Sequence, residues 1–186
     1  HRERAAGRPL DRHADQDRAV GPPAGGVRPA RREPGARAGR PLAGEADIRE
    51  SARSIEALID EQRARGIAAR RIVLAGFSQG GVIALHLGLR YREPLAGIMA
   101  LSTYLHDPEH LVDEISLENA GIPIFMAHGL MDPMIPITRA VTSREALRAL
   151  SYPIEWHEYA MGHSVCLEEI KDIARWLTAC IAKAGA

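Results

Sequence analysis

The sequence has no excess of charge and only two cysteines. Its 24 Lys and Arg residues balance 24 Asp and Glu residues, so the formal net charge at pH 7 is zero. A balanced chain offers no overall attraction for nucleic acid or for an anionic membrane. Cys166 and Cys180 are predicted to lie on one helix with about 21 Å of rise between them, which is too far for a disulfide. This pattern favours a reduced, cytoplasmic setting.

Long hydrophobic runs are also absent. No stretch reaches the roughly 20 apolar residues that a membrane-spanning helix needs, and no charged segment followed by an apolar one resembles a signal peptide. We therefore expect no stable membrane insertion. The hydrophobic content is nevertheless 46%, which suffices for the core of one domain in a chain of 186 residues.

Residues 1–44 lack the side chains that build a core. They contain no aromatic residue, six of the twelve prolines, and ten arginines against five acids. Such a segment cannot bury enough apolar surface to offset the entropy of ordering it. We predict a low-complexity, disordered arm over residues 1–44 and a folded domain over residues 45–186. Only Arg31 and Arg32 are adjacent basic residues in this arm, and no aromatic ring is available for stacking, so we predict no nucleic-acid binding.

One stretch of the folded part points to chemistry. Arg71–Ala75 is predicted as a short buried strand, and Gly76-Phe77-Ser78-Gln79-Gly80 follows it with the pattern Gly-x-Ser-x-Gly. A helix is predicted from Val82 to Tyr91. Strand, sharp turn and helix are typical of a nucleophile elbow, in which glycines two residues before and after the serine let strand and helix approach each other. The alternative is a tight-turn serine of an ordinary strand-to-helix connection.

The remaining pattern predicts an α/β fold with a mostly parallel sheet. Apolar runs without polar alternation indicate strands covered on both faces, and helices are predicted between them. The other predicted strands are Leu95–Ser102, Ile122–Ala127 and Pro153–Tyr159. The predicted helices are one containing Ile48 to Gln62, a short one that opens at Asp107-Pro108, then Thr138–Leu150 and Ser164–Ala182. The last helix is expected to face the sheet with Cys166, Ile170, Ile173, Leu177, Cys180 and Ile181.

Three residues at strand ends suggest a catalytic triad. Ser78, Asp132 and His163 lie in loops at the carboxyl ends of strands, where such sheets collect functional residues, and they follow the chain order of α/β-hydrolases. A serine hydroxyl needs a base within hydrogen-bond reach and a carboxylate that orients the base. Taken singly, Asp132 before a proline could begin a turn, and His163 could belong to the start of the last helix.

The other histidines fit these roles less well. His86, His128 and His157 lie in a predicted helix or in predicted strands, and none follows the last strand. His106 and His110 are four residues apart and could share a metal ion, but no third ligand stands on the same unit. We predict neither a metal site nor a cofactor.

Four motifs in order give the chain a family resemblance. They are Gly-Phe-Ser-Gln-Gly-Gly at 76–81, Leu-Ser-Thr-Tyr-Leu at 101–105, His-Gly-x-x-Asp-Pro-x-Ile-Pro at 128–136 and Met-Gly-His-Ser-Val at 161–165. From about Ala46 to Ala182 the chain resembles the bacterial carboxylesterase and phospholipase branch of the α/β-hydrolases, which includes acyl-protein thioesterases. The resemblance implies a Ser78 nucleophile, a His163 base and an Asp132 orienter. These would act without a cofactor on small-molecule acyl esters of short or medium chain length, on lysophospholipids or on acyl thioesters, with the Gln79 backbone N–H in the oxyanion hole.

The resemblance does not extend to the N-terminus. Similar proteins begin with several strands and a loop that supplies a second oxyanion donor, and residues 1–44 show no such pattern. The expected fold is therefore an α/β-hydrolase whose N-terminal strands are missing. The elbow strand would then carry an unpaired edge, which predicts self-association into a homo-oligomer. The alternative function is a catalytically silent or weakly active hydrolase-like fragment that lacks a complete oxyanion hole.

Apolar residues near Asp132 suggest where an acyl chain would bind. Met131, Met134 and Ile135 lie in the same predicted loop. Apolar side chains beside a reacting group are typical of ligand pockets. We expect these three residues to line an acyl pocket.

Overall fold

The computed structural model describes residues 44–184, so the predicted arm lies outside the described residues except for Gly44. Four strands form one sheet in the order β1-β2-β3-β4, and every neighbouring pair is parallel. The strands are β1 (Val73–Phe77), β2 (Gly97–Leu101), β3 (Ile124–Gly129) and β4 (Ile154–Tyr159). Parallel neighbours need long crossover connections, and helices supply them here.

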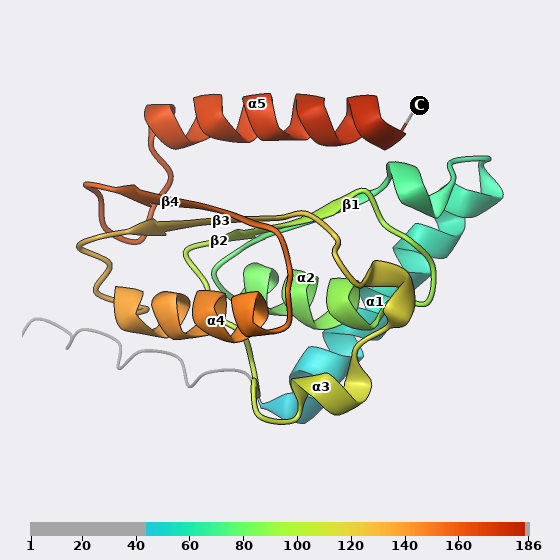
Figure 1. Cartoon of the computed structure of the whole chain (residues 1–186), viewed down its shortest axis with the longest axis horizontal. Coiled ribbons are helices and arrows are strands. Elements are labelled where there is room, and N and C mark those ends of the chain that lie inside the picture. Colours follow the sequence, from blue (N-terminus) through green and yellow to red (C-terminus); the bar gives the residue numbers. More distant parts are fainter. Residues whose placement is uncertain (1–43, 185–186) are drawn as a thin grey trace, which may run out of the picture. The chain divides into compact units, whose positions relative to one another are not determined.

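Helices cover both faces of this sheet (Figure 1). α1 (Glu45–Ala64), α2 (Gln79–Arg90) and α4 (Ile137–Ala149) lie on one face, and α5 (Leu167–Ala184) lies on the other. The connections contain α3 (Leu111–Glu114) and two 3₁₀ turns, Ala69–Arg71 and Leu117–Asn119. None of the helices in residues 44–184 is long and apolar enough to cross a membrane. The architecture is the predicted parallel sheet between helices.

The central strands contribute alternate residues to two cores. The core on the side of α2 contains Ile98, Ala100, Ile124 and Met126. The core on the side of α5 contains Met99, Leu101, Phe125 and Ala127. Because helices cover β2 and β3 on both sides, both strands are buried along their whole length. Their uninterrupted apolar runs reflect this double covering.

The elbow strand begins and ends two residues later than predicted. Arg71, the first residue of the predicted strand, belongs instead to the 3₁₀ turn Ala69–Arg71, and the ladder with β2 continues to Phe77 opposite Leu101. The Ser78 backbone N–H then donates to the Leu101 carbonyl oxygen at 2.9 Å. Ser78 therefore stands directly at the end of the strand. Within residues 44–184, β1 pairs only with β2, and the self-association expected from this edge stays a prediction.

Two helix starts also lie later than predicted. Asp107-Pro108 does not open a helix, because Asp107 adopts a φ of 47° and its carboxylate contacts the His110 ring, and α3 begins only at Leu111. α5 begins after Cys166 rather than at Ser164, so the two cysteines do not share a helix. Both thiols are free, and the cytoplasmic setting inferred from them stays a prediction.

α5 is rotated relative to the predicted apolar stripe. Ile170 and Ile181 are 52% and 51% exposed, whereas Trp176 is buried. The Trp176 ring packs near Phe125 with 5.7 Å between ring centroids. Burying this large ring contributes more than burying either isoleucine, so it decides which side of α5 faces the sheet. Of the predicted stripe, Ile173, Leu177 and Cys180 do pack on the sheet.

Candidate active site

Ser78 stands at a sharp turn between β1 and α2. Its φ of 55° and ψ of −122° form a strained conformation for a residue with a side chain. A Cβ on Gly76 would lie 2.1 Å from the Gly80 backbone, so only glycine fits there. At Gly80 an added Cβ would meet nothing within 4 Å among the described residues, so the predicted need for a second glycine at that position is wrong. The tight contact on the helix side occurs at Gly81, where a Cβ would lie 2.6 Å from the Thr103 side chain.

His163 connects Ser78 to Asp132. Nε2 of the His163 ring lies 2.9 Å from Oγ of Ser78, and Nδ1 lies 2.7 Å from Oδ2 of Asp132. Ser78 follows β1, Asp132 follows β3 and His163 follows β4, so three strand ends supply the cluster. The structure brings together the three residues predicted from the sequence. This arrangement lets an imidazole accept a hydroxyl proton on one nitrogen while a carboxylate holds the other.

The Asp132 carboxylate is anchored by its own loop. Oδ1 accepts hydrogen bonds from the backbone N–H groups of Met134 and Ile135 at 2.8 and 2.9 Å, and the side chain has no exposed surface. Burial acts to raise the pKa of Asp132, but the hydrogen bonds from His163 and from the two backbone N–H groups outweigh it and lower the pKa below its usual value. Asp132 is therefore ionised at neutral pH, which is the form that orients an imidazolium.

A buried histidine supports the same loop. His128 has no exposed surface, and its Nε2 lies 2.9 Å from the Ile135 carbonyl oxygen and 3.5 Å from Oδ2 of Asp132. An Nε2–H donated to that carbonyl ties the far end of the loop to β3. The sequence presents His128 only as a competing base, so this supporting role is not predicted. The signal in the sequence that could have indicated this role is a histidine at the end of an otherwise apolar strand.

Three further residues lie around Ser78. The Phe77 ring packs against the His163 ring with 4.7 Å between centroids, and Thr103 Oγ1 donates to the Ser78 carbonyl oxygen at 2.7 Å. Gln79 is the first residue of α2, so its backbone N–H has no intrahelical partner and lies at the positively polarised end of the helix. Such an N–H is suited to bind a developing oxyanion.

The expected acyl pocket is not enclosed. Met131 and Met134 are 65% and 60% exposed on the surface. Ile135 instead belongs to a buried cluster with Ile48, Val82 and Tyr104. The prediction that these three residues line one pocket is therefore wrong, because the loop turns its methionines outward while Ile135 packs beneath it. Apolar surface lies open beside the candidate site.

Comparison with known proteins identifies the family. A sequence profile described as Phospholipase/Carboxylesterase matches residues 36–181. The chain belongs to this family. Acyl-protein thioesterase 1 of Neurospora crassa is 40% identical over 137 residues, which are 72% of this chain and 56% of that protein. Acyl-protein thioesterase 1 of Yarrowia lipolytica is 36% identical over 133 residues, which are 70% of this chain and 59% of that protein. The chain thus spans just over half the length of these curated relatives.

Solved structures related to this member of the Phospholipase/Carboxylesterase family share its fold. The structure of Arabidopsis thaliana SOBER1 has a TM-score of 0.70 and 26% identity, and the match covers 74% of this chain and 66% of that chain. Esterase PE8 has a TM-score of 0.68 and 28% identity over 73% of this chain and 62% of that chain. The predicted α/β-hydrolase fold and carboxylesterase family are confirmed. The bacterial branch is not, since the curated relatives named above are fungal.

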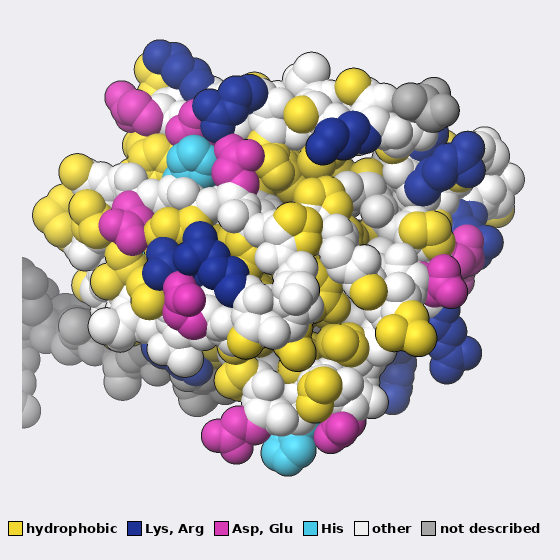
Figure 2. All heavy atoms as spheres, in the orientation of Figure 1, with side chains coloured by type: hydrophobic (Ala, Val, Ile, Leu, Met, Phe, Trp, Pro, Cys, Tyr) yellow, Lys and Arg dark blue, Asp and Glu magenta, His cyan; other side chains and the backbone are white. Residues whose placement is uncertain are grey.

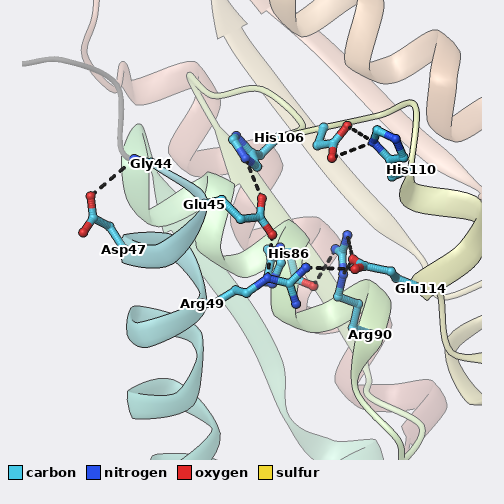
Figure 3. Close-up of polar contacts among 10 residues, drawn as sticks. Gly44, Glu45, Asp47, Arg49, His86, Arg90, His106, His110 and Glu114 are labelled. Atoms are coloured by element: carbon cyan, nitrogen blue, oxygen red, sulfur yellow. Dashed lines mark hydrogen bonds and ion pairs between the residues drawn. The ribbon is translucent and has the colours of Figure 1, made fainter.

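The two histidines considered for a metal contact different carboxylates in this family member. Nε2 of His106 lies 2.9 Å from Oε2 of Glu45, and Nδ1 of His110 lies 2.9 Å from Oδ1 of Asp107 (Figure 3). In the part of the chain that the structure describes, no three His, Cys, Asp or Glu side chains come together as metal ligands.

An ion-pair network joins α1, α2 and α3 (Figure 3). Glu114 accepts hydrogen bonds from Arg49 at 2.8 Å and from Arg90 at 2.7 Å, and these two guanidinium groups lower the pKa of Glu114 to about 2. The buried His86 lies beside the two arginines. Burial, together with the charges of Arg90 and Arg49, lowers the pKa of His86 to about 4. The network ties the short helix α3 to α1 and α2.

Proposed function

We propose that this chain is a serine hydrolase that cleaves acyl esters of short or medium chain length through a covalent acyl-enzyme. The observation that carries the proposal is the hydrogen-bonded series from Ser78 through His163 to the buried Asp132. Acyl thioesters are included as substrates because two relatives are named acyl-protein thioesterase 1. Lysophospholipids are included because the family is described as Phospholipase/Carboxylesterase.

The proposed reaction begins when Oγ of Ser78 attacks the acyl carbonyl carbon. Nε2 of His163 takes the hydroxyl proton, and the Asp132 carboxylate stabilises the resulting imidazolium. The Gln79 backbone N–H donates to the oxyanion of the tetrahedral intermediate. His163 then gives its proton to the departing alcohol or thiol, which leaves the acyl group on Ser78.

The second half of the reaction releases the acyl group. Water attacks the acyl-enzyme while His163 accepts one of its protons. The second tetrahedral intermediate collapses to a carboxylic acid, and the proton on His163 returns to Oγ of Ser78. The enzyme is regenerated without a cofactor, because every proton passes through the His163 ring.

A catalytically silent or weakly active chain is the second candidate function. One observation favours it: within residues 44–184, β1 is an edge strand with a single partner, and only Ser78 separates this strand from the candidate oxyanion donor Gln79. Loss of one of two oxyanion donors typically lowers kcat by about 10²- to 10³-fold. The two candidates therefore differ in turnover and agree on the fold.

Hydrolysis of p-nitrophenyl butyrate tests the proposal. Ser78→Ala and His163→Ala are each expected to lower kcat by about 10⁴-fold or more, because they remove the nucleophile and the base. Ser164→Ala is the matched control, since Ser164 is exposed and follows His163 directly. Its activity is expected to equal that of the parent.

Two results would change the assignment. Turnover by Ser78→Ala at the parent rate would exclude Ser78 as the nucleophile. A parent that is folded by circular dichroism, yet shows no turnover above the Ser78→Ala background, would instead support the silent chain.

A further inference from the structure

The loops that carry Asp132 and His163 expose a large apolar surface. Six side chains, between 43% and 65% exposed, form what is called here the apolar rim: Leu130, Met131, Met134, Val165, Leu167 and Ile170. They are half of the twelve large apolar side chains that are exposed within residues 44–184. Figure 2 shows hydrophobic side chains gathered on the left of the molecule, over the loops that follow β3 and β4. Concentrated apolar surface of this kind marks an interaction site.

The two loops lie against each other, so the rim is one surface. The Met131 backbone N–H donates to the Met161 carbonyl oxygen at 3.0 Å, which joins the loop after β3 to the loop after β4. Leu167 and Ile170 follow in the first turn of α5, where residues three apart share a face. Phe77, which is 37% exposed and packs on the His163 ring, continues the apolar surface toward the reacting serine.

The rim carries little net charge. Residues 129–136 and 160–170 contain no Lys or Arg. Of their three acids, Asp132 and Glu169 are buried, and only Glu168 is exposed. Lys171 is exposed, follows Ile170 directly and lies one turn after Leu167 on α5. One acid and one base therefore border the rim, and their charges offset each other. An apolar surface with so little net charge gains little from anionic lipids, and it loses little solvation when it enters a neutral lipid interface.

We propose that the apolar rim docks on a zwitterionic lipid surface and so brings Ser78 to acyl esters held there. The inference rests on the proposed function, because the rim adjoins the candidate nucleophile of an ester hydrolase. A lipid surface is the occupant that matches both the apolar, nearly uncharged rim and a substrate with an acyl chain. Methionine suits such a surface, since its flexible thioether chain adapts to irregular apolar contacts.

Sedimentation with phosphatidylcholine vesicles tests the docking without any turnover. The parent is expected to sediment with the vesicles. A double variant, Met131→Ser with Leu167→Ser, removes one exposed side chain from each loop and is expected to bind about tenfold more weakly or worse. The matched control is Val112→Ser with Leu117→Ser, because these side chains are 57% and 84% exposed outside the rim. It is expected to sediment like the parent, and melting temperatures verify that all three proteins are folded.

Salt and lipid charge test the chemistry of the surface. Because the rim carries little net charge, the binding that the rim variant loses is expected to be the same at low and high salt and not to increase when phosphatidylserine is added. Binding that requires phosphatidylserine and disappears at high salt would overturn the assignment to a zwitterionic surface.

The remaining outcomes distinguish a lipid surface from other occupants of the rim. They also distinguish failure of the docking from failure of the proposed function. Equal sedimentation of the parent and the rim variant, or no sedimentation of a folded parent, would overturn the docking. A parent dimer that becomes a monomer in the rim variant, without vesicle binding, would assign the rim to a second copy of the chain. Because Ser78→Ala is expected to bind vesicles like the parent, vesicle binding without ester hydrolysis would refute the proposed function and keep the docking surface.

Discussion

Two aspartate–histidine pairs in this chain have similar distances and different surroundings. In one pair, Nδ1 of His163 lies 2.7 Å from Oδ2 of Asp132, and in the other, Nδ1 of His110 lies 2.9 Å from both carboxylate oxygens of Asp107. The histidine and aspartate side chains are 17% and 0% exposed in the first pair, and 71% and 39% exposed in the second. Distance alone does not distinguish a candidate active site from a surface contact.

Backbone support and a third partner distinguish the first pair. Asp132 accepts two backbone N–H groups from its own loop, and the second ring nitrogen of His163 faces Ser78. In the second pair, the hydrogen bond to Asp107 raises the pKa of His110, but solvent screens the interaction. The comparison teaches that the fold around the pair, rather than the pair itself, creates the chemistry.

Removing the aspartate charge from each pair tests this comparison, and it is the prediction with the largest expected effect. Asp132→Asn keeps the size of the side chain and removes its charge, and it is expected to lower kcat for p-nitrophenyl butyrate on the order of 10⁴-fold, because the imidazolium loses its partner. Asp107→Asn makes the same change in the exposed pair, and it is expected to leave kcat within about twofold of the parent. Similar losses in both variants would remove the distinction between the pairs.

The triad residues could be predicted because their positions follow from sheet geometry. Ser78, Asp132 and His163 each follow an apolar run, and the carboxyl ends of parallel strands meet at one edge of a sheet. The anchoring of Asp132 by its loop and the support from His128 could not be predicted in the same way. Both depend on how the loop folds back on itself, and no residue pattern reports that path.

Element boundaries were less predictable than the elements themselves. The predicted elbow strand ends at Ala75, because Gly76 is typical of a turn, yet hydrogen bonds to β2 extend the strand to Phe77. Likewise, helical periodicity alone could not exclude Ile170 from the buried side of α5, since the position of the Trp176 ring decides it. Pairing partners and packing volume determine these details, and both are properties of the fold.

Substitution of the elbow glycines tests what shapes the turn that carries Ser78, the third partner of the Asp132–His163 pair. Gly76→Ala is expected to lower the free energy of unfolding by about 2–3 kcal/mol, because its Cβ would lie 2.1 Å from the backbone of Gly80. Gly80→Ala has open space in the first turn of α2, and it is expected to change that free energy by less than about 1 kcal/mol. Denaturant titrations of both variants measure the difference. Equal destabilisation would refute the steric account of the elbow.

His86 extends the comparison to a buried histidine ring that lies beside two arginines. Burial, followed by the charges of Arg90 and Arg49, lowers the pKa of His86 from 6.5 to about 4, while the carboxylates of Glu45 and Glu114 act in the opposite direction. Because the unfolded chain binds this proton more readily, His86 contributes stability that is present above about pH 6.5 and lost as the pH falls toward 4.

Substitution of His86 should therefore change how stability depends on pH. His86→Gln is expected to flatten the fall in the free energy of unfolding between about pH 6.5 and pH 4. His110→Gln is the matched control in the exposed pair, where Asp107 raises the pKa, so any contribution has the opposite sign and is lost as the pH rises. Denaturant titrations at a series of pH values measure both slopes. An unchanged acid slope in His86→Gln would show that the ring takes up its proton in the folded chain as readily as in the unfolded one.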